Sequence, residues 1–107
     1  MNVLATSIDF DSAYSLQSML AAVQPLCEYV ARHESSTLSY EVMVSDKPGV
    51  HRCLVFERYS DKDHAYLAVH RASREFQTFR EFLRGMQRAG TATVHGDSFN
   101  ESGLGFV

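Results

Sequence analysis

The residues best suited to chemistry lie in one stretch of the chain, between Leu54 and Leu83. His70 stands in a helical pattern, and an imidazole exchanges protons near neutral pH. Glu57 and Tyr59 are two positions apart in a run of β-forming residues, so their side chains point to the same face of the predicted strand. We take His70 as the candidate proton carrier, and Glu57 and Tyr59 as candidate substrate contacts.

Two arginines follow His70 closely. A regular helix through this segment would bring four residues to one face, because they are spaced i, i+3, i+4 and i+7: Leu67, His70, Arg71 and Arg74. A carboxylate on the covered face of a sheet must be paired or protonated, since an unpaired buried charge is costly. We therefore expect Arg71 or Arg74 to pair with Glu57.

Tyr40 and Tyr66 add aromatic rings with a polar end, which suit a pocket for a planar ligand. Each candidate also has a purely structural interpretation. His70 would then pack where a helix meets the sheet, Glu57 would form a structural ion pair, and the tyrosines would fill the core. The residue types alone leave both interpretations open.

Sequence patterns typical of bound metals are absent. The chain contains no C-x-x-C, H-x-H or H-E-x-x-H, so we expect no metal site. It also has no glycine-rich phosphate loop, because Gly103-Leu104-Gly105 is followed by no helix. We expect no bound cofactor.

Composition narrows the class of protein. The chain has 45% hydrophobic and 21% charged residues, which predicts one globular domain over residues 1–107. A net charge of −3 argues against nucleic acid as a partner. The sequence has no run of about eighteen apolar residues, so we expect no membrane span. The first ten residues lack a signal-peptide pattern, and Cys27 and Cys53 are expected to be free thiols. We therefore expect a cytoplasmic protein.

Hydrophobic periodicity predicts seven regions of secondary structure. We expect a strand over Val3–Phe10 and then a helix from Ala13, with a kink or break near Gln24 caused by Pro25. Strands over Thr37–Ser45 and His51–Tyr59 should follow, joined by the turn Asp46–Gly49. After them we expect two helical segments, capped at Ser60 or Asp61 and at Ser73, and a last strand over Thr91–Phe99 that is broken at Gly96. The second of the two segments should bury Phe76, Phe79, Leu83 and Met86.

The order β-α-β-β-α-β is typical of the split βαβ or ferredoxin-like arrangement, an α+β fold with a four-stranded antiparallel sheet and helices on one face. The strand Arg52–Tyr59 is apolar on both faces, so its other face also needs cover. That open face should carry either Cys53 and Val55 or Leu54 and Phe56, with part of the row Leu38, Tyr40, Val42 and Val44. We expect a homodimer burying more than roughly 1,500 Å² in total, with the tail 100–107 docking on the partner and Leu104–Val107 as a strap.

The central stretch resembles the antibiotic-biosynthesis monooxygenase (ABM) family. The resemblance rests on Glu57, Tyr59, Ala65 or Tyr66, His70, Ser73, Phe76 and Phe79, and extends more loosely from Val3 to Met86. It implies a dimeric α+β barrel that oxidises a polycyclic phenol, anthrone or quinol with dioxygen, without metal or flavin, in secondary metabolism. It also implies roles for the candidates: His70 as base or proton shuttle, Tyr40, Tyr59 and Tyr66 as aromatic contacts, and Arg71 or Arg74 steadying negative charge.

Two further hypotheses use the same barrel. A cyclase, isomerase or decarboxylase would employ the same acid–base residues without oxygen, and a non-catalytic dimer would only bind an aromatic ligand or a protein. The chain also departs from the family pattern at two positions. Many relatives carry a histidine where Glu75 stands, and often a tryptophan where Tyr59 stands.

Overall fold

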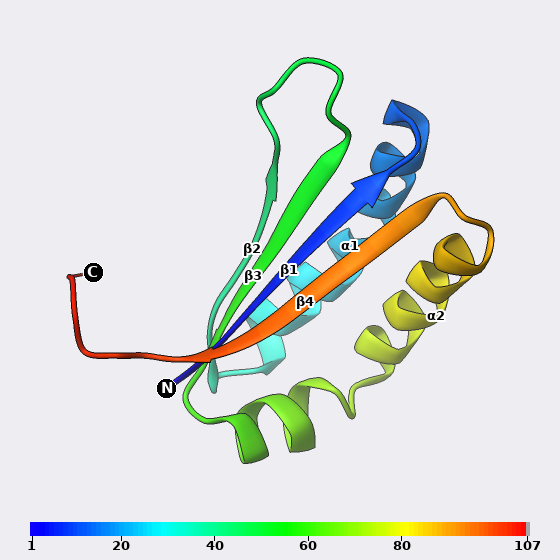
Figure 1. Ribbon diagram of the computed structural model, residues 1–107. Coiled ribbons are helices and arrows are strands. Elements are labelled where there is room, and N and C mark those ends of the chain that lie inside the picture. The colour runs from blue at the N-terminus through cyan, green and yellow to red at the C-terminus, as the bar shows by residue number, and fades with distance from the viewer. Residues whose placement is uncertain (107) are drawn as a thin grey trace.

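Seven helices and strands follow one another along residues 1–106, the part of the chain that the computed structural model describes (Figure 1). They are β1 (Asn2–Phe10), α1 (Ala13–His33), β2 (Thr37–Val44), β3 (Arg52–Tyr59), the π-helix η1 (Lys62–His70), α2 (Arg74–Arg88) and β4 (Ala92–Asn100). The predicted order β-α-β-β-α-β is confirmed, with η1 and α2 together in the second helical position.

The four strands form one sheet in the order β2-β3-β1-β4, and every neighbouring pair is antiparallel. The break expected in the last strand at Gly96 is wrong. Gly96 pairs with Thr6, and β4 continues without interruption to Asn100. A glycine weakens a strand, but here the long central neighbour β1 supplies the backbone pairing that holds β4 in register.

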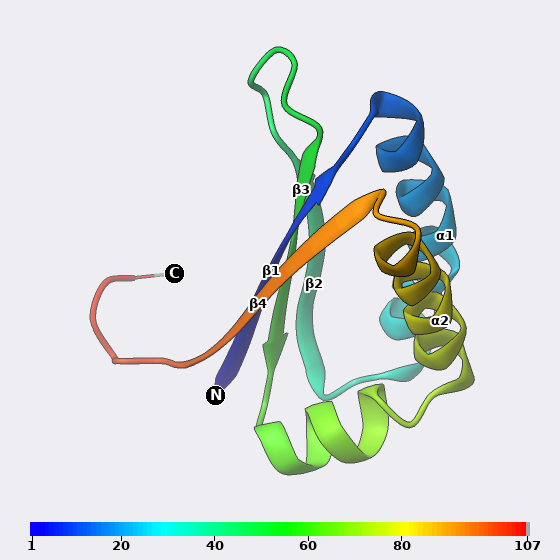
Figure 2. The same ribbon diagram turned by 45° about the vertical axis from the view of Figure 1, so that its right-hand side comes forward.

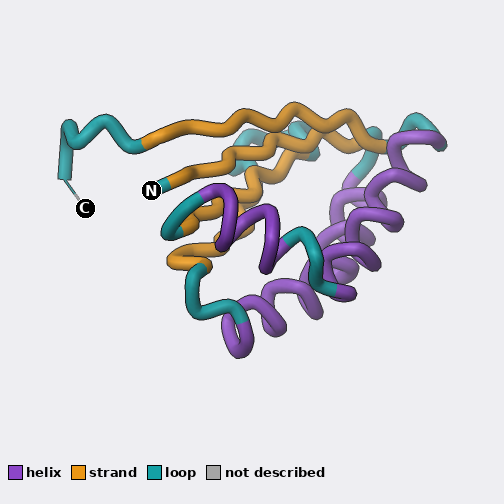
Figure 3. The backbone as a smooth tube through the Cα atoms, turned by 90° about the horizontal axis from the view of Figure 1, so that it is seen from below, coloured by secondary structure: helices purple, strands orange, loops and turns teal. Residues whose placement is uncertain are grey.

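The molecule has two layers, the sheet and the helices that cover one of its faces (Figure 3). Figure 2 shows α1 and α2 on one side of the sheet, with η1 closing the end of the helical layer. The core lies between the layers and is built mainly from Ile8, Met19, Leu26, Val55 and Phe79. This is the ferredoxin-like α+β fold that the sequence predicts.

The break expected in the first helix does not occur, since α1 runs from Ala13 to His33 through Pro25. The proline side chain is exposed. On that side of the helix, water can bond the carbonyl group that loses its helical donor, so the helix tolerates the missing hydrogen bond.

The predicted capping residues hold both ends of the segment that shapes the site. Asp61 Oδ1 accepts the backbone N–H of His64 at 2.6 Å, and Ser73 Oγ accepts that of Phe76 at 3.0 Å. At the other end of α2, Gly90 adopts φ +77°. The Thr91 N–H then reaches the Met86 carbonyl at 2.9 Å, a bond that ends the helix sharply.

The π-helical geometry of η1 changes which residues share a face. The Arg71 N–H donates to the Tyr66 carbonyl, five residues back, at 3.0 Å. The buried residues of η1 are accordingly Ala65 and His70, whereas Leu67 is 40% exposed. The chain then turns at Ser73 before α2 begins, so the expected common face of Leu67, His70, Arg71 and Arg74 is wrong.

The face of the sheet turned away from the helices carries the Leu54 and Phe56 set, one of the two alternatives that the sequence left open. Cys53 and Val55 lie in the core instead. The register pairs Val42 with Val55, which turns Tyr40 and Val42 toward the helices as well. Tyr40 and Val42 of the expected row are therefore not on the open face.

Candidate functional site

A cluster of polar side chains is buried where α1, β3 and η1 meet. His70 ends η1 and is completely buried, Glu57 and Tyr59 lie on the helix-facing side of β3, and Glu34 caps the end of α1. The prediction that Glu57 and Tyr59 share a face is confirmed. Buried charged groups are rare without partners, so the contacts within the cluster decide what it can do.

The four side chains form a continuous chain of contacts. His70 Nδ1 lies 2.9 Å from Glu34 Oε1, and His70 Nε2 lies 3.7 Å from Glu57 Oε1. The Tyr59 hydroxyl donates to the same Glu57 oxygen at 2.5 Å. Since a carboxylate oxygen only accepts, the bond to Glu34 places the proton of a neutral His70 on Nδ1.

The expected ion pair between Glu57 and Arg71 or Arg74 does not form, because the partners of Glu57 are Tyr59 and His70. The Arg71 guanidinium lies over the Tyr66 ring, 5.9 Å from its centroid. The Arg74 side chain is 90% exposed and 3.9 Å from Glu75, outside the cluster.

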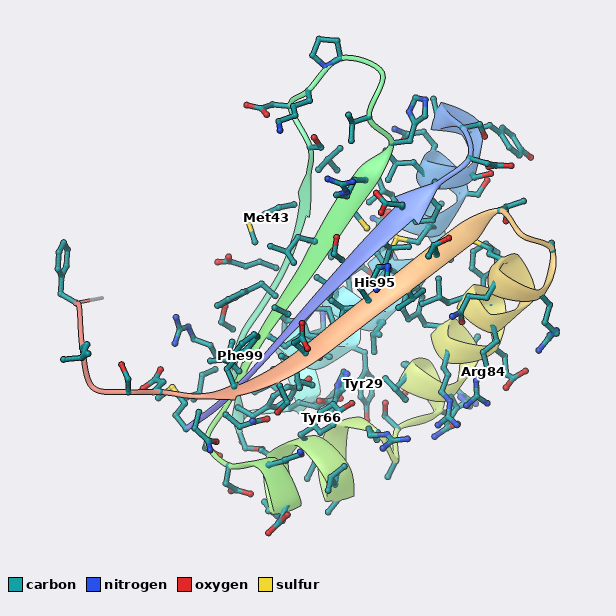
Figure 4. The ribbon with its side chains drawn as sticks, in the orientation of Figure 1. Tyr29, Met43, Tyr66, Arg84, His95 and Phe99 are labelled. Atoms are coloured by element: carbon teal, nitrogen blue, oxygen red, sulfur yellow. The ribbon has the colours of Figure 1, made fainter. Side chains whose placement is uncertain are left out.

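Aromatic rings enclose the His70 imidazole. Four ring centroids lie between 5.0 and 6.2 Å from that of His70, those of Tyr40, Tyr59, Tyr66 and Phe76. Figure 4 shows Tyr66 on the side of η1 that faces the sheet. The rings exclude water from the imidazole, so its charge state depends on its protein neighbours.

A pocket of about 180 Å³ opens beside this cluster, between the sheet and α2. Its lining combines apolar side chains with a few polar ones: Leu4, Thr6, Ile8, Tyr40, Val55, Glu57, Tyr66, Phe76, Phe79, Arg80 and Leu83. A wider groove of about 550 Å³ shares Leu4, Thr6 and Tyr66 with it and extends to Arg71. Apolar walls with a few convergent polar groups are typical of small-molecule sites.

The structure thus separates the predicted site residues into three groups. Tyr40, Glu57 and Tyr66 line the pocket, and Arg71 lines the adjoining groove. His70 and Tyr59 are fully buried behind the pocket wall. Arg74 lies on the outer surface.

Sequence reasoning missed Glu34 and Arg80. Arg80 is four residues after Phe76 and three before Leu83, so it is a charged residue within the apolar stripe of α2, and that position was the signal. Glu34 is a carboxylate at the C-terminal end of a helix, where the helix dipole disfavours negative charge. The nearby His70 is the partner that holds it there.

Burial sets the charge states in the cluster. It raises the pKa of the Glu57 carboxyl to about 7; the hydrogen bond from Tyr59 opposes this shift, and the charge of Glu34 adds to it. Burial also lowers the pKa of the His70 imidazole, which Glu34 partly offsets. It raises the pKa of Tyr40 and of Tyr59 well above the usual range, with the Glu57 charge adding to both shifts. Near neutral pH, Glu57 is therefore the group poised to gain or lose a proton.

This arrangement predicts how stability depends on pH. The folded protein holds a proton on Glu57 up to about pH 7, whereas the unfolded chain releases it near pH 4.5. That contribution to stability is complete below pH 4.5 and is lost as the pH rises through 7. Relative to Glu57→Gln, the wild-type protein should lose on the order of 3 kcal/mol across this window.

Urea denaturation of the two proteins at equal concentration, between pH 4.5 and 8, measures this difference. His70 contributes with the opposite sign, because its lowered pKa makes stability rise with pH up to about 6.5. Both proteins retain His70, so the difference between them reports Glu57 together with its contact to His70. A stability gap that stays constant with pH would show that Glu57 is ionised in the folded state throughout.

Within residues 1–106, no group of three or more histidine, cysteine, aspartate or glutamate side chains is arranged to hold a metal ion. In the same residues, no helix is both long and apolar enough to cross a membrane.

No protein-family model and no curated protein matches the chain, but solved structures share its fold. "Putative antibiotic biosynthesis monooxygenase from Nitrosomonas europaea" superimposes with a TM-score of 0.75 at 17% identity, covering 95% of this chain and 99% of that one. A protein of the same description from Deinococcus radiodurans gives 0.74 at 11% identity, over 100% and 98% of the two chains. A dimeric ferredoxin-like protein from an uncultured marine organism gives 0.69 at 19% identity, over 94% of each.

At these identities the similarity is one of fold. It confirms the predicted ferredoxin-like architecture, and this fold is shared over nearly the whole chain with structures described as putative antibiotic biosynthesis monooxygenases.

Proposed function

We propose that this chain, which has the fold of antibiotic biosynthesis monooxygenases, oxidises a phenolic aromatic compound with dioxygen and needs neither metal nor flavin. The observation that carries the proposal is the position of Glu57. Its carboxyl group, with a pKa near 7, lines an apolar pocket between aromatic side chains and is backed by His70. A base in a dry pocket is what a substrate of this class requires.

The chemistry begins with loss of a proton. An anthrone or quinol that is deprotonated becomes an electron-rich anion able to pass an electron to dioxygen. For an anthrone, the CH2 carbon combines with dioxygen and ends as a carbonyl group, while the second oxygen atom leaves as water. The protein has to remove the first proton, hold the anion and return a proton to the departing oxygen.

The pocket provides for holding the anion. The rings of Tyr40, Tyr66 and Phe76 lie along its wall and suit a flat aromatic molecule. Arg80 contributes a positive charge to the same wall, where it would steady a phenolate or enolate oxygen. The adjoining groove lined by Tyr66 and Arg71 leaves room for further rings of a polycyclic substrate.

Oxygen uptake tests the proposal. The protein, with EDTA present, is given a panel of anthrones, hydroquinones and naphthols, and uptake is compared with the spontaneous rate. We expect faster uptake with at least one compound, and a KM raised about tenfold or more by Arg80→Gln, since a charged hydrogen bond to the substrate is lost. Arg84→Gln, on the outer side of the same helix, is the matched control and should change nothing.

The absence of uptake with the whole panel would overturn the proposed reaction. Turnover of the same compounds under nitrogen would instead assign the site to a cyclase, isomerase or decarboxylase, because those reactions use the acid–base cluster without oxygen. The two results are distinguishable by product analysis.

We also propose that the protein is a homodimer, joined through the face of the sheet that the helices leave open. Leu54 and Phe56 lie on that face in β3, while Met43 and Phe99, from the two edge strands, are 42% and 52% exposed (Figure 4). Residues 101–106 lie on the same side (Figure 2) and border a groove of about 510 Å³ with this face. The dimeric ferredoxin-like protein of similar fold supports a second copy as the cover.

The tail contributes two nearly fully exposed side chains to this side, Leu104 and Phe106, at 90% and 101%. Glu101 anchors its start through an ion pair with Arg58 at 2.5 Å. We propose that the tail docks on the partner subunit, since apolar side chains gain from leaving water. Val107, the last residue of the expected strap, lies outside the described residues.

A further inference from the structure

The pocket and the buried histidine are separated by Glu57. Glu57 lines the pocket, whereas His70 has no exposed surface and is enclosed by aromatic rings. A proton that leaves a molecule in the pocket therefore meets Glu57 first. It reaches the imidazole only through that carboxyl group.

The two oxygens of Glu57 have different surroundings. Oε1 accepts the Tyr59 hydroxyl at 2.5 Å and faces His70 Nε2 at 3.7 Å. Within residues 1–106, Oε2 has no hydrogen-bond partner. It is not fully buried, so it remains in contact with solvent. Because the side chain lines the pocket, Oε2 is the oxygen available to a bound molecule.

One ring nitrogen of His70, Nε2, is free to accept a proton. The Nδ1–H is committed to Glu34 at 2.9 Å, which leaves Nε2 with a bare lone pair. This nitrogen is buried without a hydrogen-bond partner among the described residues. Buried polar atoms almost always have one. The nearest candidate is the Glu57 carboxyl, which becomes a donor only when it carries a proton.

We propose that Glu57 exchanges the proton with the substrate, and that His70, held by Glu34, takes this proton from Glu57 and returns it. The proposal rests on the proposed function and names the path of its proton. His70 acts only through Glu57 and never meets the substrate, so it is a positioning residue. Of the two roles that the family resemblance implies for His70, base or proton shuttle, this is the second, with Glu57 as the group that meets the substrate.

A substrate C–H or O–H bond breaks, its electron pair stays on the substrate, and an O–H bond forms at Glu57 Oε2. A half-turn of the carboxyl group about Cγ–Cδ then points this O–H toward His70 Nε2. The proton moves to Nε2, giving an imidazolium that the Glu34 carboxylate stabilises through Nδ1–H. For an anthrone, the reverse sequence delivers this proton to the outer oxygen of the peroxide that forms when dioxygen adds to the carbanion. Loss of the second C–H proton then forms the carbonyl group and breaks the O–O bond, and the released hydroxide takes up that second proton and leaves as water.

The surrounding charges favour this exchange. Glu57 and His70 are faced by Glu34 and Cys27 of α1, Tyr40 of β2, Tyr59 of β3, Tyr66 of η1 and Arg80 of α2. Burial raises the pKa of Glu57 and lowers that of His70, so Glu57 keeps a proton at a pH where an exposed carboxyl group has lost it. A protonated Glu57 is the donor that the unpartnered Nε2 of His70 lacks.

Nuclear magnetic resonance of the histidine rings tests the path without any substrate. The chain has five histidines, and His70→Gln identifies the ring signals of His70 by their loss. We expect the Nδ1–H tautomer above neutral pH, and a Nε2 chemical shift that follows the titration of the Glu57 carboxyl carbon. In Glu57→Gln that inflection should vanish. Glu81→Gln, whose side chain is 65% exposed on α2, should leave it unchanged.

An Nε2–H tautomer, or the same His70 curve in Glu57→Gln and wild type, would overturn the proposal. The backbone amide spectrum of each variant is recorded first, to establish that the variant keeps the native fold. Glu57→Asp serves as a second variant: it keeps the carboxyl group but withdraws it from His70, and should weaken the coupling without abolishing the titration.

Kinetics with a compound from the panel that is turned over add a second readout. Glu57→Gln should lower kcat by about 10²–10⁴-fold, the usual contribution of a general base. Formate should restore part of the activity of Glu57→Ala, since the vacated position opens to the pocket. His70→Gln should change the pH profile of kcat and leave KM unaltered. If no compound is turned over, the proposed function fails, while the ring titration still decides whether the proton path exists.

Discussion

Replacing Phe79 with alanine is expected to cost about 3–5 kcal/mol of folding free energy, the usual loss for a buried aromatic side chain. Phe79 is 8% exposed and belongs to the core between sheet and helices. It also lines the pocket, so the residues around it cannot collapse fully into the vacated space. Urea denaturation at fixed protein concentration measures the loss, because a dimer's stability depends on concentration.

Phe82→Ala provides the matched control. Phe82 lies three residues further along α2, and the same substitution changes helix propensity equally, but its ring is 40% exposed. We expect a loss below about 1 kcal/mol for this variant. Equal losses for the two variants would mean that α2 does not present Phe79 to the core.

The fold was largely predictable because its signals are local. The repeat of Phe76, Phe79, Leu83 and Met86 at helical spacing, the caps at Asp61 and Ser73, and the turn before β3 each predict their element without reference to the rest of the chain. The features that were predicted wrongly depend instead on the surroundings of a residue in the folded protein. Pro25 is tolerated because its side of α1 faces water, and Gly96 because β1 pairs with it.

The sequence also could not predict which face each strand turns to the helices. Alternation along β3 shows that residues 53 and 55 lie opposite residues 54 and 56, but not which set is inside. That choice follows from the register with β1, which aligns Ile8 with Cys53. The same register places Glu57 and Tyr59 in the helical layer, and so places the site.

The sequence predicted which residues form the candidate site better than it predicted the contacts between them. His70, Glu57 and Tyr59 do come together, as their shared stretch of sequence suggested. The α-helical spacing used for His70 was nevertheless inapplicable, because η1 is a π-helix and its turn is longer. Glu34 reaches His70 from 36 positions away in the chain, a distance over which local pattern carries no information.

The wild-type protein is expected to sediment as a homodimer at low micromolar concentration, whereas Leu54→Glu should be monomeric. Leu54 lies on the central strand β3, on the open face of the sheet, opposite Ser7 and Met43. In a two-fold dimer each substitution occurs twice, so the interface would have to bury two unpaired carboxylates. The penalty of several kcal/mol corresponds to a rise of at least about 100-fold in the dimer Kd.

Phe82→Glu tests whether any new surface charge has this effect. It adds the same charge at an exposed aromatic position on α2. This helix lies on the opposite side of the sheet from the open face (Figure 2). It should leave the dimer intact. Circular dichroism of all three proteins separates dissociation from unfolding. A folded wild-type monomer at low micromolar concentration would contradict the homodimer, and it would leave Leu54, Phe56, Leu104 and Phe106 as an apolar surface that serves another partner.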